Sequence, residues 1–258
     1  MTRSVAALYD IHGNLPALEA VLAELAADPA DAVVIGGDVA SGPMPVAVLE
    51  RLRSLPWPVH WLRGNADRAL VMGFDGTIPP ELLVQPLYSA DAWTARFISR
   101  ADRDWLDGLP PVIRLAVDGL GEVLFCHATP RSDEERVTVF ASEERLGRIL
   151  AQDGAPVLVA GHTHRQFDRA AGGRRMVNAG SVGRPYEHEP GAYWVRLGPG
   201  VELRRTEYDV AAATGAFRAI DYPLADTMLA PVDADAIARR YEEKGDAALD
   251  PASLTGAA

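Results

Sequence analysis

Short apolar runs alternate with segments of helical periodicity along the first part of the chain. The runs SVAALY, DAVVIGGD and PVHWLRGN each end in glycine or polar residues, a pattern typical of buried strands. The intervening segments place apolar residues at helical spacing, and Asn14 precedes the first of them as its expected N-cap. We expect strands at residues 4–9, 31–38 and 58–65 and helices at residues 15–27 and 43–55. This alternation predicts a parallel sheet with right-handed crossovers.

The pattern changes in the second half of the chain. Residues 80–110 carry a helical apolar stripe, and short strand-like runs follow it. These runs predict a second, mostly antiparallel sheet from residues 112–117, 122–128, 156–164, 174–182, 192–197 and 201–208. Two helices are expected within residues 209–245. Because no linker rich in proline, glycine or serine divides the chain, we expect one α/β domain over residues 1–248 and a flexible tail at 249–258.

The composition narrows the class of partner. Of the 258 residues, 48% are hydrophobic and 24% are charged, with a formal net charge of -11. Such an acidic chain, with no basic stripe of interleaved aromatic residues, argues against long nucleic acids and anionic membranes as partners. Cys126 is the single cysteine, and no apolar run approaches the ~18 residues of a membrane span. We therefore expect a cytoplasmic protein.

Residues with metal-binding side chains follow several of the predicted strands. The carboxyl ends of strands in an open α/β sheet converge on one crevice, so side chains from distant parts of the chain meet there. The candidate ligands are Asp10, His12, Asp38, Asn65, His127, His162 and His164.

The spacing and types of these residues indicate two cations. Asp10 with His12, and His162 with His164, are i, i+2 pairs whose side chains point to the same side of an extended chain. Oxygen and imidazole donors without a convincing thiolate suit Mn²⁺, Fe, Ni²⁺ or Zn²⁺ in an open site. Seven donors are too many for one open ion, and a pair of ions roughly 3.5–4 Å apart needs a bridging ligand, for which the carboxylate of Asp38 is our choice.

Taken together, these motifs resemble the calcineurin-like metallophosphoesterases. The pattern comprises D-x-H from Asp10, G-D at 37–38, G-N-x-D at 64–67, an isolated strand-end His127, and G-H-T-H at 161–164. The stretches YDIHGNLPALEAVL and NAGSVG are similar to compact bacterial phosphodiesterases and phosphatases of this superfamily. The motifs follow one another in the family's order over most of the chain.

The resemblance implies a four-layer αββα sandwich, in which two mixed β-sheets are flanked by helices, with two divalent metal ions, most of all Mn²⁺. One metal would be held by Asp10, His12 and His164, the other by Asn65, His127 and His162, with Asp38 bridging. A metal-bound hydroxide would attack the phosphorus of a small phosphoester in line. Asp38, Asn65 and His127 would serve catalysis by holding that hydroxide and positioning the phosphoryl group.

Position 66 departs from many larger members of the family, which carry there a histidine thought to protonate the leaving oxygen. Ala66 cannot do this, so we expect substrates with acidic leaving groups, or a proton from solvent or from His188. Asp67 is expected to cap the next helix or orient a ligand histidine, and Arg184 to contact substrate. Cys126 is expected in the core, the acidic run DEER in solvent, and residues 70–90 as a lid beside the site.

Two other interpretations stay open. A non-catalytic metal-binding scaffold resembling a retromer subunit has the same fold, although here no candidate ligand is missing. A mononuclear centre could use Asp10, His12 and His164 as a facial triad, which leaves Asn65 and His127 without a role. Among enzymes, the substrate could be a cyclic nucleotide, another phosphodiester, a phosphomonoester or a dinucleoside polyphosphate.

Overall fold

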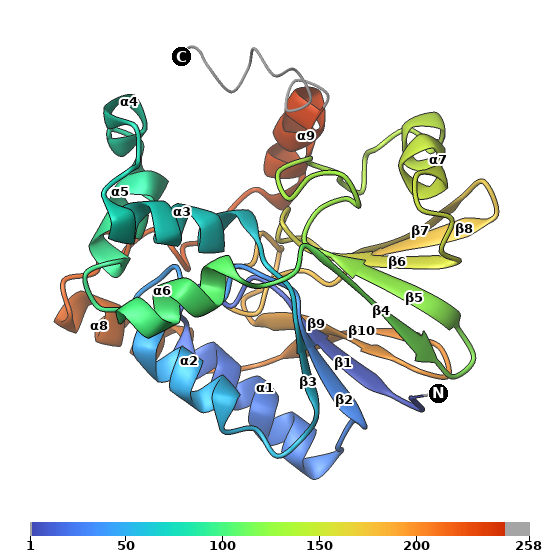
Figure 1. Ribbon diagram of the computed structural model, residues 1–258, viewed down its shortest axis with the longest axis horizontal. Helices are drawn as coiled ribbons and strands as arrows, with labels where there is room; N and C mark the ends of the chain where they lie inside the picture. The colour runs from blue at the N-terminus through green and yellow to red at the C-terminus, as the bar shows by residue number, and fades with distance from the viewer. Residues whose placement is uncertain (1, 246–258) are drawn as a thin grey trace.

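Two five-stranded sheets packed face to face form the centre of the computed structural model, which describes residues 2–245 (Figure 1). The first sheet has the order β10-β9-β1-β2-β3. Its strands are β1 (Val5–Leu8), β2 (Ala32–Ile35), β3 (Val59–Trp61), β9 (Ala192–Leu197) and β10 (Val201–Thr206). Strands β1, β2 and β3 are parallel, whereas β9 and β10 pair antiparallel on the other edge.

The second sheet has the order β4-β5-β6-β8-β7. Its strands are β4 (Val112–Val117), β5 (Gly121–Cys126), β6 (Val157–Ala160), β7 (Phe167–Ala171) and β8 (Arg174–Asn178). The central strands β5, β6 and β8 are parallel, and the edge strands β4 and β7 run antiparallel to their neighbours. Both sheets are therefore mixed, as the family resemblance implied.

Helices cover the outer faces of the sheets and give the four-layer arrangement (Figure 1). Helices α1 (Leu15–Ala27) and α2 (Pro45–Arg53) lie on the first sheet, and α7 (Glu143–Ala151) lies on the second. Asn14 caps α1 by accepting a hydrogen bond from the backbone N–H of Ala17. The remaining helices are α3 (Asn65–Asp75), α4 (Pro80–Leu83), α5 (Pro86–Thr94), α6 (Arg100–Asp107), α8 (Val210–Ala219) and α9 (Ala234–Gly245). None of the helices in residues 2–245 has the length and apolar character required to cross a bilayer.

The core explains why the strand sequences are continuously apolar. In β1, Val5 and Ala7 face the layer between the two sheets, whereas Ala6 and Leu8 face the layer under α1 and α2. A strand buried on both faces has no polar positions to alternate with. Cys126 is buried in the layer between the second sheet and α7, which confirms its expected place in the core.

The sequence placed two strands in the wrong sheet. Residues 192–197 and 201–206 form a hairpin, as an antiparallel pattern predicts, but the hairpin joins β1 in the first sheet. The second sheet also has a parallel centre and is not mostly antiparallel. The sequence pattern of a hairpin indicates how its own two strands pair. It does not indicate which other strand the hairpin joins, because tertiary packing decides that. Strand β7 and helix α7 were not predicted as elements, and α3 was anticipated only through its expected cap, Asp67.

The predicted tail at residues 249–258 lies outside the described residues. The two C-terminal helices fall within residues 209–245, as expected. That residues 1–248 form one domain stays a prediction.

We expect Tyr9→Phe to lower the free energy of unfolding by about 1–3 kcal/mol. The fully buried Tyr9 hydroxyl donates to the carbonyl oxygen of Val159 at 3.0 Å and so joins β1's end to the other sheet. Denaturant unfolding of the metal-free protein measures the change. Tyr222→Phe is the matched control, because the Tyr222 hydroxyl makes no hydrogen bond with residues 2–245. Equal effects of the two changes would contradict this link between the sheets.

Candidate metal centre

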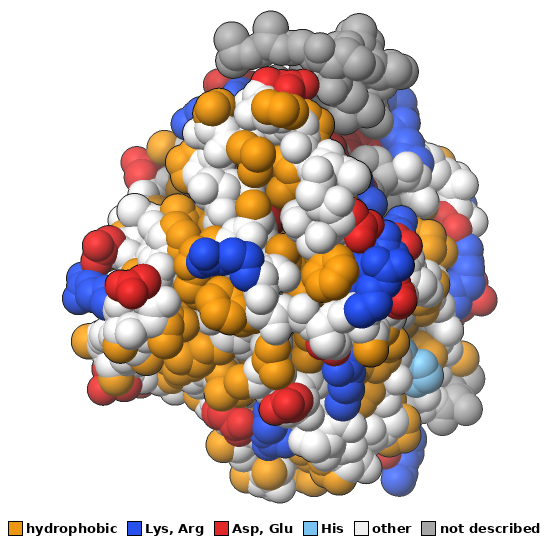
Figure 2. Space-filling view, turned by 60° about the vertical axis from the view of Figure 1, so that its left-hand side comes forward, with side chains coloured by type: hydrophobic (Ala, Val, Ile, Leu, Met, Phe, Trp, Pro, Cys, Tyr) orange, Lys and Arg blue, Asp and Glu red, His pale blue; other side chains and the backbone are white. Residues whose placement is uncertain are grey.

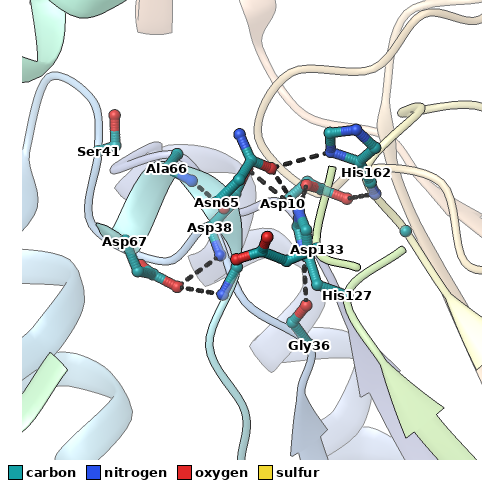
Figure 3. Close-up of polar contacts among 12 residues, drawn as sticks. Asp10, Gly36, Asp38, Ser41, Asn65, Ala66, Asp67, His127, Asp133 and His162 are labelled. Atoms are coloured by element: carbon teal, nitrogen blue, oxygen red, sulfur yellow. Dashed lines mark hydrogen bonds and ion pairs between the residues drawn. The ribbon is translucent and has the colours of Figure 1, made fainter. Parts of the chain in front are cut away.

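All seven candidate ligands lie where strands of the two sheets end. Figure 3 shows five of them, Asp10, Asp38, Asn65, His127 and His162. Asp10 and His12 follow β1, Asp38 follows β2, and Asn65 is the first residue of α3 after β3. In the second sheet, His127 follows β5, and the other two histidines, His162 and His164, follow β6. Within each sheet these strands are parallel to one another, β1 with β2 and β3 in the first sheet and β5 with β6 in the second, which brings their carboxyl ends to one edge.

The backbone at these positions is strained. Six non-glycine residues in the described part of the chain have positive φ, and all but Asp221 are candidate ligands. The angles are 53° at Asp10, 47° at His12, 53° at Asp38, 66° at His162 and 57° at His164. Non-glycine residues rarely adopt this left-handed conformation, which costs of order 1–3 kcal/mol where it is strained. The concentration of such residues around one point marks a functional site.

Backbone carbonyls fix the protonation of all four histidine rings. Each ring has one nitrogen against a carbonyl oxygen, which can only accept a hydrogen bond, so that nitrogen carries the proton. His12 Nδ1 donates to Ser41 at 3.1 Å, His127 Nδ1 to Gly36 at 2.9 Å, His162 Nε2 to Glu134 at 3.0 Å and His164 Nδ1 to Arg184 at 2.7 Å. In a neutral ring the other nitrogen is then an unprotonated lone pair, which is the form that binds a metal.

The first group of lone pairs surrounds Asp10. His12 Nε2 lies 3.2 Å from His164 Nε2, and Asp10 Oδ1 lies 3.3 Å from the latter. Asp10 Oδ1 is fully buried and accepts no hydrogen bond from the described residues. Ligand atoms of these three residues and Asp38 lie within 4.8 Å of one another. A buried carboxylate oxygen and two opposed ring lone pairs without a proton between them suit a cation.

The second group of lone pairs surrounds Asn65. Its Oδ1 lies 3.0 Å from His127 Nε2 and 2.9 Å from His162 Nδ1. Ligands about 2.1 Å from one ion and at right angles to each other are about 3 Å apart, which matches these separations. Turning the amide over would direct its NH₂ at both rings, so the orientation with oxygen inward is the one that suits a cation.

Asp38 lies between the two groups. Its Oδ2 is 3.6 Å from His12 Nε2 on one side and 3.4 Å from His127 Nε2 on the other. Its Oδ1 accepts a hydrogen bond from the backbone N–H of Ala66 at 2.7 Å. This position would allow one carboxylate to reach two ions.

The ionisation of the cluster follows from its charges. Burial opposes ionisation of Asp38 and is the largest single influence, but the charge and hydrogen bond of His127, together with the other nearby histidines, outweigh it and hold the pKa of Asp38 well below its usual range. Conversely, burial lowers the pKa of His127, but Asp38 outweighs it and raises the pKa to about 10. Burial lowers the pKa of His12 to about 4 and that of His162 to about 3. In the metal-free protein, a proton on His127 therefore compensates the carboxylates.

Asp67 holds the strand ends in place (Figure 3). Its carboxylate accepts the backbone N–H groups of Gly64 at 2.9 Å, Asp38 at 2.8 Å and Val39 at 3.0 Å. It therefore caps α3 and also fixes the loop after β2. Burial and the negative charge of Asp38 outweigh these donors and raise the pKa of Asp67 to about 6. A Cβ on Gly64 would collide with Asp38, which explains glycine there.

The expectation that the run DEER is solvated was wrong. Glu135 is 1% exposed and accepts from Thr129 Oγ1 and Arg131. Arg68 on α3 binds Asp133 through two hydrogen bonds, at 2.7 and 3.0 Å, and Glu134 through one. Because the carbonyl of Glu134 also orients His162, this segment supports the site. The sequence of these four charged residues does not indicate that Arg68, 65 positions before Asp133, binds them.

A cavity of about 250 Å³ opens beside the cluster. It is lined by His12, Asp38, Asn65, His162 and His164, and by residues of other elements that include Arg68, Asp91, Arg184, Tyr88, Tyr186, Tyr222 and Tyr241. The predicted lid, residues 70–90, is largely helical and borders this cavity through residues of α3 and α5. Sequence reasoning missed Asp91, Tyr222 and Tyr241, which no motif distinguishes from core or surface residues.

Of the two residues expected to meet the substrate, Arg184 lies at the cavity and His188 does not. Arg184 lines the cavity, and its buried Nε has no hydrogen-bond partner among the described residues. The side chain of His188 is 63% exposed, lies 3.6 Å from Asp235, and is not among the residues that line the cavity. The structure therefore does not bring His188 to the site as a proton donor.

We expect Asp67→Asn to lower the free energy of unfolding by about 1–3 kcal/mol, because the introduced NH₂ would face a backbone N–H donor. Chemical denaturation of the metal-free protein measures the loss. Asp104→Asn, at a side chain that is 54% exposed and pairs with Arg100 on the surface, is the control and should change stability by less than about 1 kcal/mol. An unchanged stability of Asp67→Asn would show that the three hydrogen bonds are dispensable.

Comparison with known proteins identifies the family. Residues 4–197 match the calcineurin-like phosphoesterase superfamily domain. An uncharacterized protein of Methanocaldococcus jannaschii is 26% identical over 230 residues, which cover 81% of this chain and 89% of that protein. A symmetrical bis(5'-nucleosyl)-tetraphosphatase of Yersinia pestis is 33% identical over 158 residues, which cover 58% of this chain. The matched part spans 50% of that tetraphosphatase.

Solved structures share the fold. A hypothetical protein from Pyrococcus horikoshii OT3 has a TM-score of 0.74 at 20% identity, with 94% of this chain and 97% of that chain covered. A metallophosphoesterase from Sphaerobacter thermophilus has a TM-score of 0.67 at 23% identity, with 93% and 98% covered. The match of the family across both sheets makes this chain a member of the calcineurin-like phosphoesterase superfamily, a superfamily of phosphoester hydrolases.

Proposed function

We propose that this chain hydrolyses a small phosphoester with the help of two divalent cations, of which Mn²⁺ is the first choice. The observation that carries the proposal is the convergence of buried lone pairs whose partner nitrogens are all committed to backbone carbonyls. Imidazole, amide and carboxylate donors match the preferences of Mn²⁺, Fe, Ni²⁺ and Zn²⁺.

The two groups of lone pairs support an assignment of the candidate ligands to two ions. Asp10, His12 and His164 would hold one ion, Asn65, His127 and His162 the other, and Asp38 both. When bound, the ions would activate water and stabilise charge on the phosphoryl oxygens. Asp38, Asn65 and His127 would then act in catalysis by positioning the reacting groups. Asp67 would hold the backbone of Asp38 and the start of α3 in position relative to each other.

Arg184 would orient the substrate. Its guanidinium lines the cavity 5.9 Å from the ring centre of Tyr186, and its buried Nε lacks a protein partner. A guanidinium suits the oxygens of a phosphoryl group by charge and by geometry. Together with the cations, Arg184 would offset the negative charge of a substrate that enters an acidic protein.

The cavity and the surface favour a small substrate. The cavity of about 250 Å³ accommodates a compact phosphoester. On the face shown in Figure 2, Lys and Arg side chains stand beside Asp and Glu and form no separate basic stripe. Dinucleoside polyphosphates, which the name of the Yersinia relative indicates for that protein, are one candidate class, beside cyclic nucleotides, other diesters and monoesters. We propose the cytoplasm as the location, since the single cysteine is free and buried.

We expect turnover of bis(p-nitrophenyl) phosphate with added Mn²⁺ and its loss in metal-free protein. Asp38→Ala should reduce kcat by more than about 100-fold, because a shared ligand matters more than the outer partners that typically contribute 10–100-fold. Elemental analysis should find two ions per wild-type chain. Asp104→Ala, a change of the same type at an exposed helix position, should retain both activity and metal.

Two outcomes would count against this function. Absence of metal-dependent turnover in the wild type, across diesters and monoesters, would contradict it, as would full activity of Asp38→Ala. Less than about one ion per chain would favour a non-catalytic scaffold of the same fold.

A further inference from the structure

Asp91 is an acid in the cavity that takes no part in the metal centre. It lies on α5, is 7% exposed and lines the cavity together with His12 and Arg184. Its Oδ1 accepts a hydrogen bond from the hydroxyl of Ser41. Its Oδ2 makes no hydrogen bond with residues 2–245, so one carboxyl oxygen is available to a molecule in the cavity.

The position of Asp91 is fixed relative to the metal ligands. The carbonyl of Ser41, whose hydroxyl binds Asp91, accepts the Nδ1–H of His12 at 3.1 Å. One residue thus separates the carboxyl group from a candidate ligand. Thr94, three residues along α5, donates to the carbonyl of Gly42 at 3.0 Å and anchors the helix to the same loop. A carboxyl held from both sides meets the positional demand of proton transfer.

No cation neutralises Asp91 directly. Within the described part of the chain it forms no ion pair, whereas Glu134, which also lines the cavity, pairs with Arg68. The charges that act on Asp91 are those of Asp38 and Asp67, which disfavour ionisation, and of Arg184, which favours it. Burial is the largest influence, and together these effects raise the pKa of Asp91 to about 7. The acid form is therefore populated at neutral pH.

Other side chains in the cavity are poorer proton donors. The four histidines of the centre have one nitrogen committed to a carbonyl and the other turned to the cluster. Burial raises the pKa values of Tyr88, Tyr222 and Tyr241 further above neutrality. Ala66, which also lines the cavity, has no proton to give. An acid is most effective when its pKa lies near the working pH, which leaves Asp91.

We propose, building on the function proposed above, that Asp91 donates a proton to the leaving-group oxygen of the phosphoester. In this step an oxygen of water forms a bond to phosphorus and gives up a proton to solvent, while the ester P–O bond breaks. The electron pair of that bond stays on the leaving oxygen, which takes the proton from the Asp91 carboxyl. The Asp91 carboxylate then recovers a proton from solvent, so no further reactant is needed.

The inference changes the class of substrate. An enzyme without a proton donor is limited to esters whose leaving group is stable as an anion, such as nitrophenolate. With Asp91 in this role, esters of ordinary alcohols, including the ribose hydroxyls of nucleotides, become substrates. Ala66 therefore need not restrict the chain to acidic leaving groups, because Asp91 on α5 would supply the proton instead.

The test compares Asp91→Asn with wild type on two diesters, the activated bis(p-nitrophenyl) phosphate and the unactivated diphenyl phosphate. General acid catalysis typically contributes about 10²–10⁴-fold, so kcat on diphenyl phosphate should fall by that factor. On the nitrophenyl ester kcat should fall by less than about tenfold, because its leaving group needs little protonation. Wild-type kcat on diphenyl phosphate should fall above a pH of about 7, where Asp91 loses its proton, and this break should be absent in Asp91→Asn.

Two readouts separate proton donation from a structural role. Asp91→Asn should keep the wild-type metal content, and carboxyl ¹³C NMR of metal-free protein should show a group titrating near pH 7 that the variant lacks. Asp104→Asn is the matched control and should leave both substrates unaffected. Equal losses on both esters, or no loss on diphenyl phosphate while the wild type is active, would overturn this inference alone. A wild type inactive on every ester would overturn the proposed function and this inference together.

Discussion

The crowding of lone pairs at the shared edge of the two sheets is the constraint on which the structure depends. Two carboxylates and three imidazoles are buried with few protons between them, and Asn65 and His162 lie half-buried beside them, an arrangement that is unfavourable without compensation. Hydrogen bonds with the backbone supply part of the compensation. Four backbone carbonyls accept hydrogen bonds from the histidine rings, and the carboxylate of Asp67 accepts hydrogen bonds from three backbone N–H groups. The apolar layers on both faces of β1 supply the rigidity that keeps these donors close.

The strained conformations of the ligands follow from the same constraint. A strand that simply continued would carry its side chains past the edge, so the backbone turns sharply at the residue that must point inward. The turn requires positive φ at Asp10, Asp38 and His162, a conformation that glycine adopts without strain. Glycine there would relax the backbone but would remove a candidate ligand. Stability is thus lower than the core alone would allow, and the surrounding hydrogen bonds hold the strained state in place.

Much of this could be read from the sequence, because strand ends and ligand types are local signals. The parallel first three strands, the cap at Asn14, the buried Cys126 and the meeting of the seven candidate ligands all follow from residues within short windows. The sheet that β9 and β10 join, the buried Glu135 and the cavity position of Asp91 depend on contacts between distant segments. A lone aspartate in an amphipathic helix is ordinarily solvated, and only the packing of α5 against Ser41 makes it different.

The cavity wall has an origin distinct from that of the metal cluster. Tyr222, Leu224, Met228 and Tyr241 line the cavity from the C-terminal part of the chain, beyond the 4–197 region that matches the family. Glu242, next to Tyr241, accepts hydrogen bonds from Thr138 and so seats α9 on the loop beside the site. Part of the wall that a substrate would meet therefore lies outside the stretch that supplies the candidate ligands, so substitutions there can reshape the cavity without touching those ligands.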